Sequence, residues 1–107
     1  MDIRLFFSYD SNGNEISKIE YRWNNKTNDW VWNYEFEYTY GNNSKTSIGY
    51  VWEQEINDWK VSSKSECVYD NNDNLTTRIS YRWDNVINNW KIESKFEAAI
   101  IVTVTEQ

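Results

Sequence analysis

Few residues in this chain could perform acid–base or nucleophilic chemistry. Among 107 residues there is no histidine, and Cys67 is the only cysteine. A thiol needs a base or a nearby cation to act as a nucleophile, so Cys67 is predicted to be a buried structural thiol. Glu35 with Glu37, or Glu93 with Glu97, would suit a glycosidase pair, but these carboxylates lie among lysines, as solvated residues do. The sequence therefore predicts no catalytic residue and no enzyme.

Two acidic segments resemble the start of a calcium-binding loop. They are Asp10–Asn14 and Asp70–Asn74. Both lack the correctly placed glycine and the distal glutamate of an EF-hand. Asp, Asn and Gly are also the residues that hairpin turns require. We therefore expect two turns here, with no metal ligands and no cofactor.

The pattern with the clearest binding chemistry combines tryptophan with amide and carboxylate side chains. Indole rings stack on the apolar faces of sugars, and Asn and Asp bind sugar hydroxyls. The tryptophans alternatively fill the end of a core, because cross-strand aromatic pairs stabilise hairpins. The candidate ligand-binding residues are Trp23, Trp30, Trp52, Trp59, Trp83 and Trp90, with Asn28, Asp29, Asn57, Asp58, Asn88 and Asn89 beside them.

These residues belong to a pattern that occurs three times. Each copy has a Tyr-x-Trp element and, seven residues after its tryptophan, a second tryptophan preceded by Asn-Asp or Asn-Asn. The copies begin at Tyr21, Tyr50 and Tyr81. A period of 29 to 31 residues holds two strands and two turns, so the chain is predicted to repeat one hairpin unit about three times.

The turns between the copies define seven strands and no helix. Ser11-Asn12-Gly13 suits a three-residue hairpin loop closed by a residue with positive φ, and Asp73 takes that place in the later copy. The connections between paired tryptophans are polar and read as longer hairpin loops. The expected strands are 2–9, 15–23, 30–40, 45–52, 59–69, 75–83 and 90–104.

Side chains that alternate strictly along each strand fall on two faces of the sheet. The register of the first hairpin is expected to place Leu5 opposite Ile19. The expected apolar face holds Ile3, Leu5, Phe7, Tyr9, Ile19, Tyr21, Trp23, Trp30, Trp32, Tyr34, Phe36, Tyr38, Tyr40, Ile48, Tyr50, Trp52, Trp59, Val61, Cys67, Tyr69, Leu75, Ile79, Tyr81, Trp83, Trp90, Ile92, Phe96 and Ile100. The expected charged face holds Lys18, Glu20, Arg22, Glu35, Glu37, Lys60, Lys64, Glu66, Arg78, Arg82, Lys91, Glu93, Lys95 and Glu97.

An apolar face of this size has to be covered. Seven strands of about nine residues make a face of roughly 1,000 Å². Soluble monomers seldom expose apolar patches beyond about 300–600 Å². The chain is therefore predicted to be one all-β domain over residues 1–107, a single antiparallel meander that forms a strongly curled open sheet or half-barrel. A homodimer is expected. The segment 98–102 is apolar on both faces, as expected of a strand that is buried on both sides or pairs with another chain.

Composition excludes some partners. The net charge is −6, which disfavours nucleic acid because binding rests on neutralising phosphates. No stretch approaches the roughly 20 apolar residues that span a bilayer. The segments Tyr9–Asn14 and Tyr69–Thr76 resemble the Tyr-Asp (YD/RHS-like) repeats of bacterial surface and secreted proteins. The Tyr-x-Trp and Asn-Asp-Trp elements resemble Asn- and Trp-rich repeats of uncharacterised secreted Bacteroidetes proteins. This resemblance implies an extracytoplasmic protein without an assigned activity.

Together these patterns favour a non-enzymatic structural or interaction module of the bacterial envelope or exterior. It would self-associate through its aromatic face or its last strand, or contact an envelope protein. Binding of a glycan at the Trp-lined edge is the second hypothesis, and a small glycoside hydrolase is the third.

Overall fold

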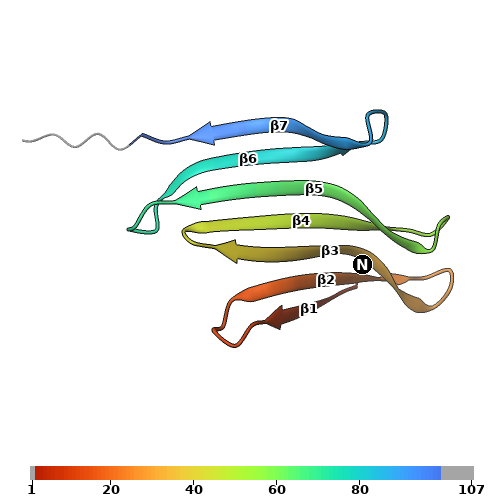
Figure 1. The fold of residues 1–107 in the computed structure, drawn as a ribbon. Coiled ribbons are helices and arrows are strands. Elements are labelled where there is room, and N and C mark those ends of the chain that lie inside the picture. The colour runs from red at the N-terminus through yellow and green to blue at the C-terminus, as the bar shows by residue number, and fades with distance from the viewer. Residues whose placement is uncertain (1, 100–107) are drawn as a thin grey trace, which may run out of the picture.

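A computed structural model describes residues 2–99, which form one antiparallel sheet of seven strands in sequence order (Figure 1). The strands are β1 (Ile3–Tyr9), β2 (Glu15–Asn24), β3 (Asp29–Gly41), β4 (Ser44–Glu53), β5 (Asp58–Tyr69), β6 (Leu75–Asp84) and β7 (Asn89–Glu97). Over this range the prediction of an all-β chain without helices is confirmed, and the sheet is open because β1 and β7 do not pair. The first six strands end within one residue of the predicted bounds.

The last strand is shorter than predicted. It ends at Glu97, and Ala98 and Ala99 follow outside the sheet, although the Ala98 amide still donates to the Thr76 carbonyl. The remainder of the predicted strand, 100–104, lies outside the described residues. The internal repeat and the strong curl of the sheet stay predictions.

The loops β1–β2 and β5–β6 use their aspartates as turn acceptors. The Asp10 carboxylate accepts hydrogen bonds from the amides of Asn12 and Asn14, both at 2.9 Å. Asp70 does the same with Asn72 and Asn74. Gly13 and Asp73 close the two turns with φ of 83° and 64°. The acidic segments are thus hairpin turns, which their composition predicted.

These turn carboxylates predict loss of stability in acid. Hydrogen bonds from the backbone of Asn14 and Asn74 lower the pKa of Asp10 and Asp70 below the ordinary value of 3.8. A depressed folded-state pKa stabilises the fold at pH above the unfolded value, and this contribution is lost as the pH falls through the folded pKa. Thermal unfolding measured from about pH 5 down to about pH 2 should show this loss.

A double variant tests the assignment. Asp10→Asn with Asp70→Asn keeps an acceptor oxygen in each turn but removes both titrating groups, so its stability should fall less between pH 5 and pH 2. Asp73→Asn, which leaves both carboxylates in place, should behave like the unaltered chain. An unchanged acid dependence in the double variant would show that other carboxylates control it.

Five strands contain an extra residue that has no partner on the neighbouring strand. These β-bulge residues are Ile16 in β2, Asn33 in β3, Ser62 in β5, Thr76 in β6 and Glu93 in β7. Asn33, Ser62 and Glu93 each lie three residues after a tryptophan of a cross-strand pair. A bulge breaks the alternation of side chains between the two faces of a sheet. Residues on the two sides of a bulge therefore do not follow the single alternation that the simple prediction assumed.

The prediction of one apolar face and one charged face is wrong for this reason. Leu5 lies opposite Glu20, and Phe6 lies opposite Ile19. We call the side that carries the six paired tryptophans the Trp face, and the opposite side the Tyr face. The apolar residues that lie on the Tyr face instead are Ile3, Leu5, Phe7, Tyr9, Tyr34, Phe36, Tyr38, Tyr40, Cys67, Tyr69, Leu75 and Phe96. The charged residues that join the Trp face are Glu35, Glu37, Lys64, Glu66, Lys95 and Glu97.

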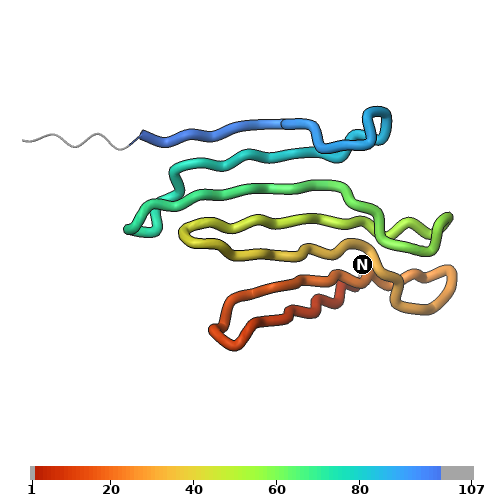
Figure 2. The backbone as a smooth tube through the Cα atoms, viewed as in Figure 1, coloured from red at the N-terminus to blue at the C-terminus, as the bar shows by residue number. Residues whose placement is uncertain are grey.

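The sheet divides into three fingers beyond these bulges, and β1 still pairs with Tyr21 and Arg22 at the base of the first one. Pairing between β3 and β4 begins only at Tyr34 with Val51, and pairing between β5 and β6 begins only at Ser63 with Arg82. The pairs β2–β3, β4–β5 and β6–β7 continue to their loops. Figure 2 shows the three separate loops at this end. We define finger I as 21–32, finger II as 50–61 and finger III as 81–92.

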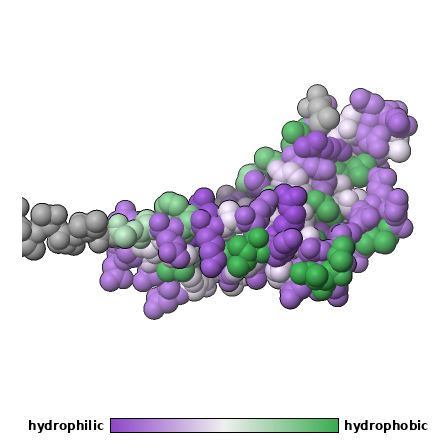
Figure 3. All heavy atoms as spheres, turned by 90° about the horizontal axis from the view of Figure 1, so that it is seen from above, coloured by the Kyte–Doolittle hydropathy of each residue, from purple (hydrophilic) through white to green (hydrophobic). Residues whose placement is uncertain are grey.

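Little of this sheet is shielded from solvent. In the described part of the chain, Cys67 is the only buried hydrophobic side chain and Glu20 is the only buried polar one. No side chain there is fully buried. The Glu20 carboxylate accepts hydrogen bonds from Arg22 at 3.2 Å and from the amide of the bulge residue Asn33 at 2.5 Å. Viewed from above, the finger end rises out of the plane of the remaining sheet (Figure 3). A hydrophobic core between two layers is not formed by the described residues.

Candidate functional site

The six predicted tryptophans form three cross-strand pairs, one on each finger. Trp23 lies opposite Trp30, Trp52 opposite Trp59, and Trp83 opposite Trp90. The ring centroids within a pair are 5.3 to 5.4 Å apart and the rings meet edge to face, at angles of 73° to 87°. This geometry suits the indole quadrupole and holds together the two strands that each loop connects. All six rings lie on the Trp face.

A seventh tryptophan, Trp32, joins fingers I and II. Its ring centroid lies 4.7 Å from that of Trp52 and 6.0 Å from that of Trp59. It is also 42% exposed, so one side of this cluster is open to solvent. Sequence reasoning placed Trp32 on the apolar face but omitted it from the site. The available signal was its position two residues after Trp30, where fingers II and III have Val61 and Ile92.

The predicted asparagines before the second strand of each finger shape the loops. Asn28, Asn57 and Asn88 have φ of 53° or 54°. Asparagine tolerates this left-handed conformation better than most residues. They therefore close the turns, which is a structural role that the sugar-binding prediction did not include.

The residues that follow them also make local hydrogen bonds. One side-chain oxygen of each accepts from the backbone amide of the next tryptophan, at 2.8 Å in all three fingers; the residues are Asp29, Asp58 and Asn89. Each keeps further hydrogen-bonding capacity, because a carboxylate has a second oxygen and an amide has its NH₂ group. Their contribution to ligand binding stays a prediction.

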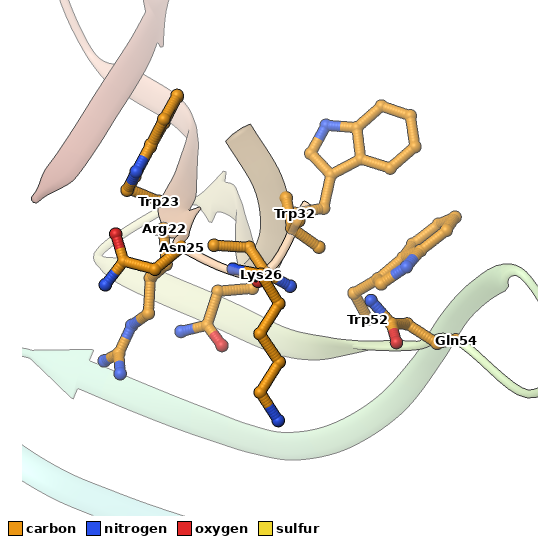
Figure 4. Close-up of a pocket in the computed structure, with 10 residues that line it drawn as sticks. Arg22, Trp23, Asn25, Lys26, Trp32, Trp52 and Gln54 are labelled. Atoms are coloured by element: carbon orange, nitrogen blue, oxygen red, sulfur yellow. Dashed lines mark hydrogen bonds between the residues drawn. The ribbon is translucent and has the colours of Figure 1, made fainter. Parts of the chain in front are cut away.

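A cleft of about 550 Å³ opens between finger I and the loop end of finger II. Figure 4 shows Trp32 and Trp52 together on one side of it and Trp23 apart from them, with the Lys26 side chain between in this view. The lining residues are Arg22, Trp23, Asn24, Asn25, Lys26, Val31, Trp32, Asn33, Trp52 and Gln54. The cleft thus combines three indoles with amide and cationic groups.

A second cleft, of about 460 Å³, lies between fingers II and III. Its lining includes one tryptophan, Trp83, and the aliphatic side chains of Val51 and Val61. Glu53 and Lys60, which also line it, form an ion pair at 3.7 Å. The two clefts therefore share their position between fingers but differ in chemistry.

Of the carboxylates considered for catalysis, Glu35 and Glu37 lie elsewhere on the Trp face, and the bulge residue Glu93 forms an ion pair with Arg82 at 2.8 Å. Burial, and then the neighbouring Glu37 carboxylate, raises the pKa of Glu35. The Tyr50 hydroxyl donates to Glu37 at 3.4 Å. The hydrolase hypothesis stays a prediction.

Other chemical groups are few in the described part of the chain. Cys67 is a free, buried thiol, as the sequence predicted. Residues 2–99 contain no cluster of three His, Cys, Asp or Glu side chains that could hold a metal ion. In the same range, no helix has the length and apolar character needed to cross a bilayer.

Three solved structures have the same fold. A protein of unknown function from Bacteroides fragilis is 23% identical with a TM-score of 0.83, over 90% of this chain and 69% of that one. DUF3836 family proteins from Parabacteroides distasonis and Bacteroides vulgatus are 17% and 15% identical, with TM-scores of 0.70 and 0.66. The match to the Parabacteroides distasonis protein covers 90% of both chains, and the match to the Bacteroides vulgatus protein covers 87% of this chain and 98% of that one. No family model matches the sequence, and no curated protein matches it.

These similarities correct the predicted family. The similar structures are DUF3836 family proteins and a protein of unknown function from Bacteroidetes, so the resemblance to YD/RHS-like repeats is wrong. The physical reason lies in the turns, where the Tyr-Asp segments supply the aspartate and positive-φ residue that any such hairpin needs. The extracytoplasmic location rested on that resemblance and stays a prediction.

Proposed function

We propose that this protein is a non-enzymatic interaction module that forms a dimer by pairing its first strand, β1, with β1 of a second copy. The single observation that carries the proposal is an uncovered apolar strip on this edge strand. Ile3, Leu5, Phe7 and Tyr9 are 51%, 43%, 47% and 60% exposed, and all four lie on the Tyr face. Edge strands with exposed apolar side chains are templates for pairing with another chain.

The sequence of β1 is complementary to itself when two copies run antiparallel. A two-fold axis through Phe6 places Ile3 opposite Tyr9 of the second copy and Leu5 opposite its Phe7. Arg4 then lies opposite Ser8, so no like charges meet. Because no bulge interrupts β1 itself, side chains of one face meet side chains of the same face over all seven residues. The pairing would also satisfy the outer backbone groups of β1.

The other edge strand is less suited to this pairing. The bulge at Glu93 interrupts β7, so a two-fold pairing centred on its middle would oppose residues from different faces. This difference favours β1 over the last strand, which the sequence had suggested as an interface.

The three fingers also support the proposal that the chain repeats one hairpin unit. Each finger is followed in its second strand by a bulge residue that lies three positions after the second tryptophan.

Light scattering after size-exclusion chromatography tests the dimer. The unaltered chain should have twice its monomer mass, and Leu5→Lys should shift it to a monomer because the ammonium would face the apolar Phe7 of the second copy. Ile92→Lys makes the same change at an exposed site on β7 and should leave the dimer intact. A monomeric unaltered chain at high concentration would overturn the proposal.

A cross-link tests the register. On a Cys67→Ser background, Phe6→Cys should give a covalent dimer under oxidation, because directly opposed residues in antiparallel strands have Cα atoms within disulfide reach. Ser8→Cys should not, because its own copy in the partner would lie about 13 Å away along the strand. Equal cross-linking of both variants would contradict the pairing through Phe6.

A further inference from the structure

We propose that the cleft between fingers I and II is a binding site for a pyranose oligosaccharide. This site is independent of the β1 pairing, because it is lined by β2, β3, β4 and their loops. The sequence predicted sugar binding along a row of three equal tryptophan pairs. The structure instead points to one cleft, with Trp32 and Gln54 as members that the sequence prediction did not include.

The aromatic part of the site is already ordered without a ligand. Trp32 contacts Trp52, Trp59 and Tyr21, with ring centroids 4.7 to 6.1 Å apart. These contacts hold the indole in place while 42% of Trp32 remains exposed. A ring that is fixed before binding loses little entropy when a ligand stacks on it. Trp32 is therefore the expected platform for the apolar face of a sugar ring.

The polar part of the site suits hydroxyl groups. Asn25 and Gln54 extend from the loops of the two fingers, and each amide offers both donors and an acceptor. Lys26 adds a flexible ammonium at the cleft (Figure 4). Apolar walls with a few convergent polar groups are typical of ligand sites, and 550 Å³ lies within their usual size range.

The second cleft of the same chain explains why only one site is expected. Between fingers II and III, Val61 stands where finger I has Trp32, and the Glu53–Lys60 ion pair occupies polar groups of the lining. That cleft offers one indole for stacking instead of three. Residues around it therefore provide controls that match the proposed site in position but lack its three indoles.

A glycan array tests the site first, followed by titration of the strongest-binding oligosaccharide with tryptophan fluorescence as the readout. Trp32→Ala should weaken binding by about tenfold or more, and Gln54→Ala should weaken it by severalfold. Asn85→Ala, at the matching loop position of finger III, should leave the affinity within about twofold. Gln54 lies in an exposed loop, so its variant tests the site even if Trp32→Ala unfolds.

Three results would overturn the proposal. They are an array without binding to any pyranose oligosaccharide, equal losses in Gln54→Ala and Asn85→Ala, and a titration in which Trp32→Ala folds and binds normally. The Leu5→Lys monomer should keep the affinity of the unaltered chain, because its substitution is outside the cleft. Failure of the dimer and failure of the sugar site are thus separate outcomes.

Discussion

Trp52→Ala is expected to lower the free energy of unfolding by about 2–3 kcal/mol. Trp52 meets Trp59 edge to face at 5.3 Å and Trp32 at 4.7 Å, so its loss removes a contact within finger II and the shorter of the two ring contacts by which Trp32 joins fingers I and II. For a chain of this size we expect the melting temperature to fall by about 10–15 °C. Thermal and urea unfolding at one protein concentration measure the effect.

Trp83→Ala is the matched control for this prediction. Among the described residues, its ring contact is with Trp90 on the same finger, at 5.3 Å. The substitution should therefore cost about 1–2 kcal/mol. If Trp83→Ala and Trp52→Ala lower the stability equally, the contact between Trp32 and Trp52 contributes nothing measurable to the stability.

Gly49→Ala is expected to destabilise the fold by about 1–3 kcal/mol through overpacking. A Cβ atom at position 49 would lie 2.9 Å from Cε1 of Phe36 and even closer to Oγ of Ser63. Gly49 is the cross-strand partner of both residues, so the Phe36 ring lies over backbone that has no side chain. Urea unfolding at fixed concentration measures the loss.

Two further variants show whether the ring causes this effect. Phe36→Leu shortens the side chain that the new methyl group would meet, so the double variant with Gly49→Ala should lose less stability than the sum of the single changes. Gly41→Ala meets only the Ser44 side chain, which can rotate away, and should cost less than Gly49→Ala. Additive losses in the double variant would rule out the contact with Phe36 as the cause.

The strands and turns could be predicted from sequence because their signals are local. Asp10 and Asp70 accept hydrogen bonds from amides two and four residues later, and Gly13 and Asp73 supply the positive φ within the same turns. These interactions involve neighbours along the chain, so composition is enough to place them. The three tryptophan pairs were also predictable, because a hairpin loop fixes which residues lie opposite each other.

The faces of the sheet could not be predicted, because a bulge has no compositional signal here. Asn33, Ser62 and Glu93 are an amide, a hydroxyl and a carboxylate, and they share only their distance from a tryptophan. The hydrogen bond from Asn33 to Glu20 spans thirteen residues, and Arg82 reaches Glu93 across eleven. Such contacts exist only after the strands have paired.

The sequence by itself determined that this chain folds into antiparallel strands, where they turn, and that tryptophans pair next to three loops. Only the tertiary structure decided which face each aromatic side chain occupies and that the sheet divides into fingers. Those decisions place Trp32 beside Trp52 and leave the apolar strip of β1 exposed. The physical reason is that one unpaired residue in each of five strands reverses the alternation beyond it, and this reversal depends on cross-strand hydrogen bonds.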